Sequence, residues 1–334
     1  MQDNHNHNQN AVSLTGLIRQ DTSMTPPRGA PTQGTNRTPA LRCAVVVMAA
    51  HLVMLQDHGV IDGHGFDAVA RALDSAQDGL LDAEALPARR LLGELAARVD
   101  AQTPTELSGA STLGLAREEW LTAIVRLTWR DAIDAALEEV LGLRASLIDL
   151  ADAHVVTIMP AFAGHRASQP TNLGHLLGGV IVPLRSASQR LFRARAAIDR
   201  SPLGAGILAG DMLALDRERQ AEVIGFASPV GNTLDAVMSV EDLVEAAEAV
   251  GAAVAPVRRL LRELGSWMRS DPDSFLLADR WQTQPEPVNP LVVVPEPIDT
   301  LIRQIAAIED RCRIVVARLR EVAYGPVGGL ADAL

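Results

Sequence analysis

The sequence predicts an all-α protein built as an elongated helical bundle, and two observations carry that prediction. Aromatic residues make up only 3% of the 334 residues, which disfavours strands, because strands draw on aromatic and β-branched side chains. Apolar residues also recur at three- and four-residue spacing over unusually long segments, which marks one buried face along each helix. Long helices joined at their ends pack as a bundle.

The order of these patterns divides the chain into three regions. Residues 1–40 are predicted to be a disordered tail, because they are polar, rich in Pro, Gly and Thr, and offer little to bury. Residues 41–105 are predicted to form a small N-terminal helical domain, whose third helix begins near Pro87. Residues 106–334 are predicted to form a central bundle domain, with long helices at residues 117–153, 172–198, 239–268 and 298–322.

Charge and composition restrict the classes of partner. The formal net charge is −11, whereas a nucleic-acid binder normally shows a basic face, so we expect no nucleic-acid partner. The chain has no lysine, which excludes any mechanism that needs a side-chain ammonium group. The first residues lack a signal-peptide pattern, and the apolar run at residues 44–50 is too short to span a bilayer. We therefore expect a cytoplasmic protein with no membrane partner.

The two cysteines are not spaced as a metal or redox motif. Cys43 and Cys312 lie far apart in the sequence, and neither belongs to a CxxC pair. We favour the interpretation that both cysteines are thiols in a reducing cytosol. A disulfide or a metal site stays open, but no sequence pattern supports either. No cofactor and no metal are expected.

Three stretches carry a resemblance to a known family. They read "SPLGAGILAGDMLALDRERQAEVIGF" at residues 201–226, "NTLDAV" at 232–237 and "MPAFAGHRASQPTNLGHLL" at 159–177. Together they resemble argininosuccinate lyase, a member of the fumarase/aspartase superfamily. The resemblance implies an all-helical fold in which four subunits share a core and three subunits build each active site. It also implies a C-terminally truncated bundle, without the family's last bundle helix and small third domain.

The family's reaction eliminates fumarate from a succinyl-substituted amine. A base removes a proton next to a carboxylate, while hydrogen bonds and cations hold the carbanion. In the loop "DRWQTQPEPVNP", at residues 279–290, the resemblance places the catalytic serine at Gln282 and the lysine at Pro287. It places the family's Thr–His pair at Ala163 and Gly164. Neither a base nor a cation stands at these four positions.

A third segment shows the same loss of charge. Residues 108–115, "SGASTLGL", stand where the family has "TGRSRNDQ". The family's Arg, Asn and Asp are thereby replaced by Ala110, Leu113 and Gly114. Ordinary argininosuccinate cleavage is therefore not expected.

Two titratable residues are the candidate catalytic groups. His165 follows the lost histidine by one position, and its unperturbed pKa of about 6.5 suits acid–base chemistry. Glu286 is a carboxylate on the loop, between Pro285 and Pro287, which would stiffen it. The alternative interpretation of His165 is a loop histidine that pairs with local carboxylates.

Candidate substrate-binding residues come from the same three segments. They are Arg166, Gln169, Trp281, Gln282, Asn289 and Ser111. With the family's assembly retained, these residues and the two catalytic candidates are expected to face one cavity between subunits. Alternatively, Arg166 pairs with local carboxylates and Ser111 is only a residue near a helix start. His175 is interpreted as an interior histidine of the bundle.

Two functions from different classes fit these observations. The favoured one is a repurposed biosynthetic enzyme that performs an elimination or a cyclisation on a non-standard, less charged small molecule. The alternative is a non-catalytic homologue that acts as a scaffold or binding partner. Long helices with wide apolar faces also predict self-association, as a dimer or a tetramer.

Overall fold

The computed structural model describes residues 37–81, 88–163, 166–211, 213, 215–270 and 296–322. These residues form two compact units. The N-terminal unit comprises the described parts of Thr25–Asp134, Ala194–Glu245 and Ala317–Leu334. The long-helix unit comprises the described parts of Ala135–Arg193 and Ala246–Val316. Several helices contribute residues to both units, so neither unit is one continuous stretch of sequence.

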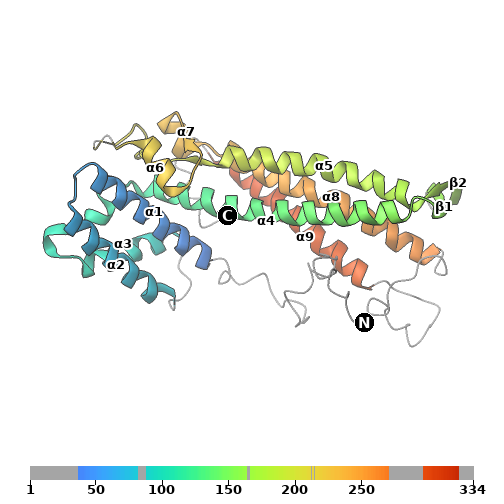
Figure 1. The fold of residues 1–334 in the computed structure, drawn as a ribbon, viewed down its shortest axis with the longest axis horizontal. Coiled ribbons are helices and arrows are strands. Elements are labelled where there is room, and N and C mark those ends of the chain that lie inside the picture. The colour runs from blue at the N-terminus through green and yellow to red at the C-terminus, as the bar shows by residue number, and fades with distance from the viewer. Residues whose placement is uncertain are drawn as a thin grey trace, which may run out of the picture. The chain divides into compact units, whose positions relative to one another are not determined.

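The N-terminal unit is organised around its first helix. Helix α1 (Arg37–Asp57) packs against α2 (Gly63–Leu81) and α6 (Arg217–Ile224), and α2 packs against α3 (Ala88–Gln102), as Figure 1 shows. Apolar side chains from these helices and from the start of α4 form one buried core, which includes Val47, Met48, Leu52, Leu95, Leu121 and Ile224. This core stabilises the N-terminal unit, in which strands contribute very little.

Short elements complete the N-terminal unit. Two 3-10 turns lead into α4, strand β3 pairs in parallel with β4, and α7 follows; their bounds are Thr105–Leu107, Ala110–Thr112, Arg200–Ser201, Ser228–Pro229 and Thr233–Met238. The side chain of Asn232 accepts hydrogen bonds from the backbone N–H groups of Leu234 and Asp235, which caps the start of α7. The asparagine of "NTLDAV" therefore has a structural role.

Helix α1 contains a stretch, Ala40–Asp57, that is long and apolar enough to cross a membrane. It is longer than the apolar run noted in the sequence. More than half of the stretch is buried inside the structure, and α1 supplies much of the core of the N-terminal unit. Burial in this core accounts for its composition. No other helix among the described residues has such a stretch.

The long-helix unit contains parts of four helices and one hairpin. The helices are α4 (Arg117–Ala153), α5 (Leu173–Ile198), α8 (Glu241–Ser270) and α9 (Glu296–Glu321). Leu147, Leu177, Leu184 and Leu260 form the buried cluster that joins α4, α5 and α8. Arg258 of α8 pairs with Glu309 of α9 at 2.7 Å. Between α4 and α5, strands β1 (Ile158–Ala163) and β2 (Arg166–Asn172) form an antiparallel hairpin with an irregularity between Pro160 and Phe162.

The prediction of an all-α helical bundle is confirmed. The observed long helices begin and end within two residues of the predicted bounds. The β1–β2 hairpin was not predicted, because its second strand is mostly exposed and lacks alternating apolar residues. Residues 1–36 of the predicted tail lie outside the described residues, and residues 37–40 begin α1. The division into domains at residues 40 and 105 stays a prediction.

A buried arginine joins three segments of the N-terminal unit. The side chain of Arg126 is 3% exposed and lies 3.0 Å from the carboxylate of Asp242. It also donates to the backbone carbonyls of Ala197 and Ile198, both at 3.4 Å. Arg200 donates to the same carboxylate at 2.8 Å. Asp242 thus compensates two cations, one of them almost completely removed from water.

Replacing Asp242 by Ala should lower the free energy of unfolding by roughly 3–5 kcal/mol, because it leaves the Arg126 guanidinium buried without its counter-ion. Asp131→Ala is the matched control, since its pair with Arg42 is exposed on both sides. That control should cost at most about 1 kcal/mol. Urea denaturation of both variants checks the prediction, and equal losses would contradict it.

Candidate functional site

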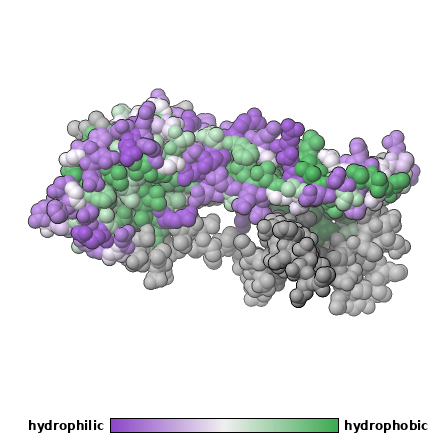
Figure 2. Space-filling model, viewed as in Figure 1, coloured by the Kyte–Doolittle hydropathy of each residue, from purple (hydrophilic) through white to green (hydrophobic). Residues whose placement is uncertain are grey.

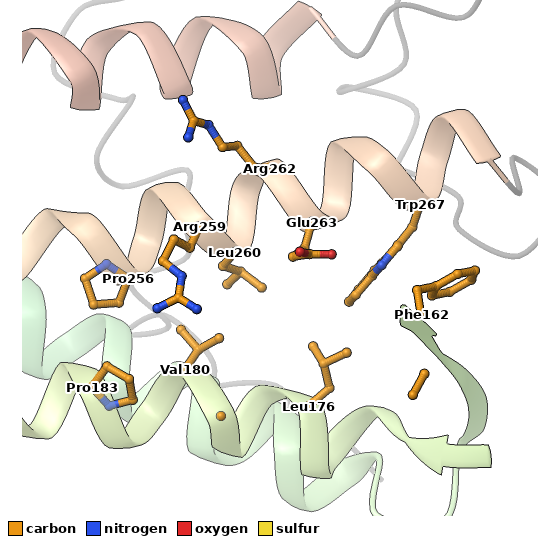
Figure 3. A pocket seen from close by; sticks show the side chains of 12 residues that line it. Phe162, Leu176, Val180, Pro183, Pro256, Arg259, Leu260, Arg262, Glu263 and Trp267 are labelled. Atoms are coloured by element: carbon orange, nitrogen blue, oxygen red, sulfur yellow. The ribbon is translucent and has the colours of Figure 1, made fainter. Parts of the chain in front are cut away.

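A cavity of 410 Å³ lies in the long-helix unit, between β1, α5 and α8. Its floor is apolar and is formed by Leu176 and Val180 of α5 and by Leu260 of α8 (Figure 3). The volume falls within the range of small-molecule sites, about 300–1,000 Å³. The cavity therefore has room for an organic molecule.

Two aromatic rings close one end of the cavity. Phe162 of β1 and Trp267 of α8 stack with ring centroids 6.3 Å apart and an interplanar angle of 29°. Trp267 is almost completely buried. Phe162 immediately precedes Ala163, the position to which the resemblance assigns the threonine of the family's Thr–His pair.

Two opposite charges stand over the rest of the cavity. Arg259 and Glu263 lie one turn apart on α8 and extend towards the cavity, and Arg262, which also lines it, directs its guanidinium to the other side of α8 (Figure 3). Both side chains are exposed, so they stand where the cavity opens to solvent. Among the ion pairs of the described residues, none contains Arg259 or Glu263. Within the described residues, no ion pair therefore neutralises either charge.

Small and cyclic residues keep the cavity open. Pro183 lies inside α5 and Pro256 inside α8, and both line the cavity. A proline in a helix interior removes one backbone hydrogen bond. Gly179 also lines the cavity, and a Cβ added there would have no atom within 4 Å. The surface of α5 at Gly179 therefore leaves room beside it.

The sequence-predicted site residues are only partly within the described structure. His165, Glu286, Trp281, Gln282 and Asn289 lie outside the described residues. Arg166 and Gln169 are exposed on β2 of the long-helix unit. Ser111 is buried in the 3-10 turn Ala110–Thr112 of the N-terminal unit. Their role as one substrate-binding set stays a prediction.

His175 is exposed on the first turn of α5, so its interpretation as an interior histidine was wrong. The neighbouring Leu176 and Leu177 take the inward positions instead. Sequence reasoning also missed the cavity residues of α8. Arg259, Glu263 and Trp267 recur at four-residue spacing and share one helix face, a signal that the sequence does contain.

A second set of polar groups lies in the N-terminal unit, around residues 108–115. His51 of α1 is completely buried, and its Nε2 lies 2.8 Å from the carbonyl oxygen of Leu113. Burial lowers the pKa of His51, so the neutral ring donates to Leu113. The side-chain amide of Gln220 lies 3.4 Å from the other ring nitrogen. These bonds fix the path of the segment over α1.

Glu119 ties the start of α4 to the Gly-rich link. Its two carboxylate oxygens accept from the backbone N–H groups of Ala116, at 2.8 Å, and Gly206, at 2.9 Å. The first bond is one half of a capping box, in which a glutamate in the first turn reaches back to the N-cap. Burial outweighs these bonds and raises the pKa of Glu119 to about 7.

The space beside Gly114 is filled by the carboxylate of Asp211 and by Leu213. Gly114 has a left-handed backbone, with φ of 74°. A Cβ added there would lie 2.5 Å from Oδ2 of Asp211 and 2.5 Å from Cδ1 of Leu213. The Oδ2 atom of Asp211 is buried and has no hydrogen-bond partner among the described residues. The carboxylate of Asp211 thus stands beside the position where the resemblance places the family's Asp.

Comparison with known proteins agrees with this fold. A family profile described as lyase matches residues 70–290. The chain belongs to the lyase family. Argininosuccinate lyase of Hyphomonas neptunium is 31% identical over 237 residues, which cover 70% of this chain and 51% of that protein. The enzyme of Chromobacterium violaceum is 30% identical over 248 residues, covering 72% and 54%. The chain spans about half the length of the curated relatives it matches.

Two solved structures share the fold of this lyase-family chain. The crystal structure of EDDS lyase in complex with formate matches with a TM-score of 0.80 and 20% identity, over 89% of this chain and 61% of that one. Class II fumarase from Schistosoma mansoni matches with a TM-score of 0.74 and 14% identity, over 89% and 71%. At such identities the likeness shows the fold alone.

Replacing Gly114 by Ala should destabilise this lyase-family chain much more than replacing Gly109. Both glycines have a positive φ, so both variants share a left-handed backbone cost of about 1–2 kcal/mol. Only Gly114→Ala also forces Asp211 and Leu213 aside, which adds roughly 1–3 kcal/mol, whereas a Cβ at Gly109 meets nothing within 4 Å. Thermal unfolding compares the two, and equal melting temperatures would show that the space beside Gly114 is open.

The raised pKa of Glu119 predicts a pH dependence of stability. Its folded-state pKa, about 7, lies above the ordinary value of 4.5, so folding favours the neutral carboxyl. The contribution of Glu119 to the free energy of unfolding is complete below pH 4.5 and is lost as the pH rises through about 7. Between pH 6 and pH 8.5 the wild type should lose roughly 1–2 kcal/mol relative to Glu119→Gln. Urea denaturation at both pH values measures this, and parallel pH profiles would contradict it.

Proposed function

We propose that the chain is a diverged enzyme of the lyase family that performs an elimination or a cyclisation on a substrate less charged than argininosuccinate, in a biosynthetic pathway. One observation carries the proposal. The positions that the resemblance assigns to the base, the lysine and the Thr–His pair hold neutral side chains, at Gln282, Pro287, Ala163 and Gly164. A substrate with two carboxylates would meet few cations at these positions. A less charged substrate needs fewer cations for binding.

The proposed chemistry uses the groups that remain near these positions. His165 or Glu286 would remove the proton next to the electron-withdrawing group of the substrate. Arg166, Gln169, Trp281, Gln282, Asn289 and Ser111 would bind the substrate. A carboxylate partly desolvated by Trp281 would have a raised pKa, which suits a base. The proposed compartment is the cytoplasm.

Self-association is part of the proposal, because the family builds its sites from several subunits. Exposed apolar residues support it. Val155, Val156 and Ile158 are 55%, 82% and 80% exposed at the hairpin end of the long-helix unit. Figure 2 shows hydrophobic surface at this end. Val182 of α5 and Ile314 of α9 are also exposed. Apolar surface of this kind is typical of a face that another chain covers.

The same apolar surface favours a second candidate function. A homologue without catalysis would keep the fold and use the exposed residues near the hairpin to hold another protein. On this alternative, His165 and Glu286 have no chemical role. The two candidates therefore differ in whether replacing these residues changes any reaction.

Purified protein should release no fumarate from argininosuccinate, because the groups that start the elimination and bind the carboxylates are replaced. Fumarate absorbance measures this, with an argininosuccinate lyase as the positive control. Turnover at ordinary enzyme rates, on the order of 1–10³ per second, would overturn the proposed divergence.

Proton exchange separates the enzyme from the scaffold. Amine adducts of monocarboxylic unsaturated acids, incubated with the protein in D₂O, should gain deuterium next to the carboxyl group, as mass spectrometry detects. His165→Ala or Glu286→Gln should remove this exchange. Exchange that is the same with and without protein across the adducts would favour the scaffold.

A further inference from the structure

We propose that the cavity between β1, α5 and α8 is a binding site for a small zwitterion with an apolar side group, of the kind represented by apolar α-amino acids. The proposal rests on the geometry of this cavity and stands whether or not the chain is catalytic. Every residue used in it belongs to the long-helix unit.

The cavity opens to solvent on one side and is large enough for an organic ligand. Small-molecule sites measure about 300–1,000 Å³. The cavity measures 410 Å³. The neighbouring cluster of leucines shows that the same helices do pack closely elsewhere. The cavity is thus a local feature of these helices, kept open by Gly179 and the two helix prolines.

The charges over the cavity are of the kind that bind a zwitterion. Arginine and glutamate four residues apart on a helix commonly pair with each other. Arg313 and Glu309 do so at 3.5 Å on α9 of the same unit. Arg259 and Glu263 have the same spacing in the opposite order, which pairs less well, and they form no ion pair among the described residues. Both extend towards the cavity (Figure 3). A ligand carboxylate would bind the Arg259 guanidinium, and a ligand ammonium group would bind Glu263.

The apolar part of the ligand has a matching position. Beyond Glu263, the cavity ends at the stacked rings of Trp267 and Phe162. Leu176 and Leu260 provide the apolar floor. The order along the cavity is therefore guanidinium, carboxylate, aromatic wall. A ligand with a carboxylate, an ammonium group and an apolar side group presents complementary groups in that order.

A second copy of this chain fits the cavity less well than a small molecule. The core of a protein–protein interface is depleted of charged residues, whereas this opening carries an arginine and a glutamate without ion-pair partners among the described residues. Burying both without specific partners would be unfavourable. A zwitterion supplies both partners, so it is the occupant that the charges favour.

A binding experiment with matched probes tests the proposal. L-phenylalanine carries both charges, phenylacetate lacks the ammonium group, and phenethylamine lacks the carboxylate. Isothermal titration calorimetry on the full chain should show the tightest binding for L-phenylalanine, with each analogue weaker by roughly tenfold or more. Arg259→Gln should weaken L-phenylalanine by a similar factor and leave phenethylamine unchanged. Equal affinities for the three probes, or no binding of any, would overturn the proposal.

Two glycine variants locate the site. Gly179→Leu fills the cavity, because a Cβ there has no atom within 4 Å, and it should abolish binding. Gly178→Leu is the control: a Cβ there is equally free of contacts, but the residue does not line the cavity. It should bind as the wild type does. Circular dichroism confirms that both fold. If Gly179→Leu binds the ligand as the wild type does, the cavity is not the ligand site. The same conclusion follows if light scattering shows that only the oligomeric state of this variant has changed.

Discussion

The buried guanidinium of Arg126 is the interaction on which the N-terminal unit most depends. It links α4 to the end of α5 through two carbonyls and to the start of α8 through Asp242. A cation this deeply buried is tolerated only when its donors are satisfied, so the three segments must meet in one arrangement. Arg200 shares the same carboxylate, which couples strand β3 to that arrangement. The polar bonds thus specify positions that apolar packing alone would leave adjustable.

The path of residues 108–115 is fixed in large part through backbone groups. His51 and Glu119 hold the backbone around it through carbonyl and N–H groups, which any sequence supplies. Ala110 and Leu115 of the segment also pack into the core of the N-terminal unit. At Gly114 the space for a side chain is taken by Asp211 and Leu213. A side chain larger than that of glycine would therefore not fit at position 114 without displacing Asp211 and Leu213.

The sequence allowed the long helices to be predicted almost to the residue, because their apolar periodicity extends over many turns. The hairpin was missed because its strands are short and its second strand is mostly exposed, so no alternation marks it. The cavity was missed for a different reason. It depends on which faces of α5 and α8 meet, and Gly179 and Arg259 are far apart in the sequence. His175 was misplaced because one step along a helix turns a side chain by roughly 100°.

The cavity proposal adds a second place of recognition to the one that the proposed function assigns to the loops. In the family that the sequence resembles, charges that bind the substrate belong to loops brought together from several subunits. Here the charges at the described cavity belong to one helix face, at Arg259 and Glu263. Groups on a helix hold their geometry better than groups on loops, because the backbone beneath them is hydrogen-bonded. Recognition of this kind needs only groups of the long-helix unit. The proposed binding of a small zwitterion therefore does not depend on which groups the loops carry.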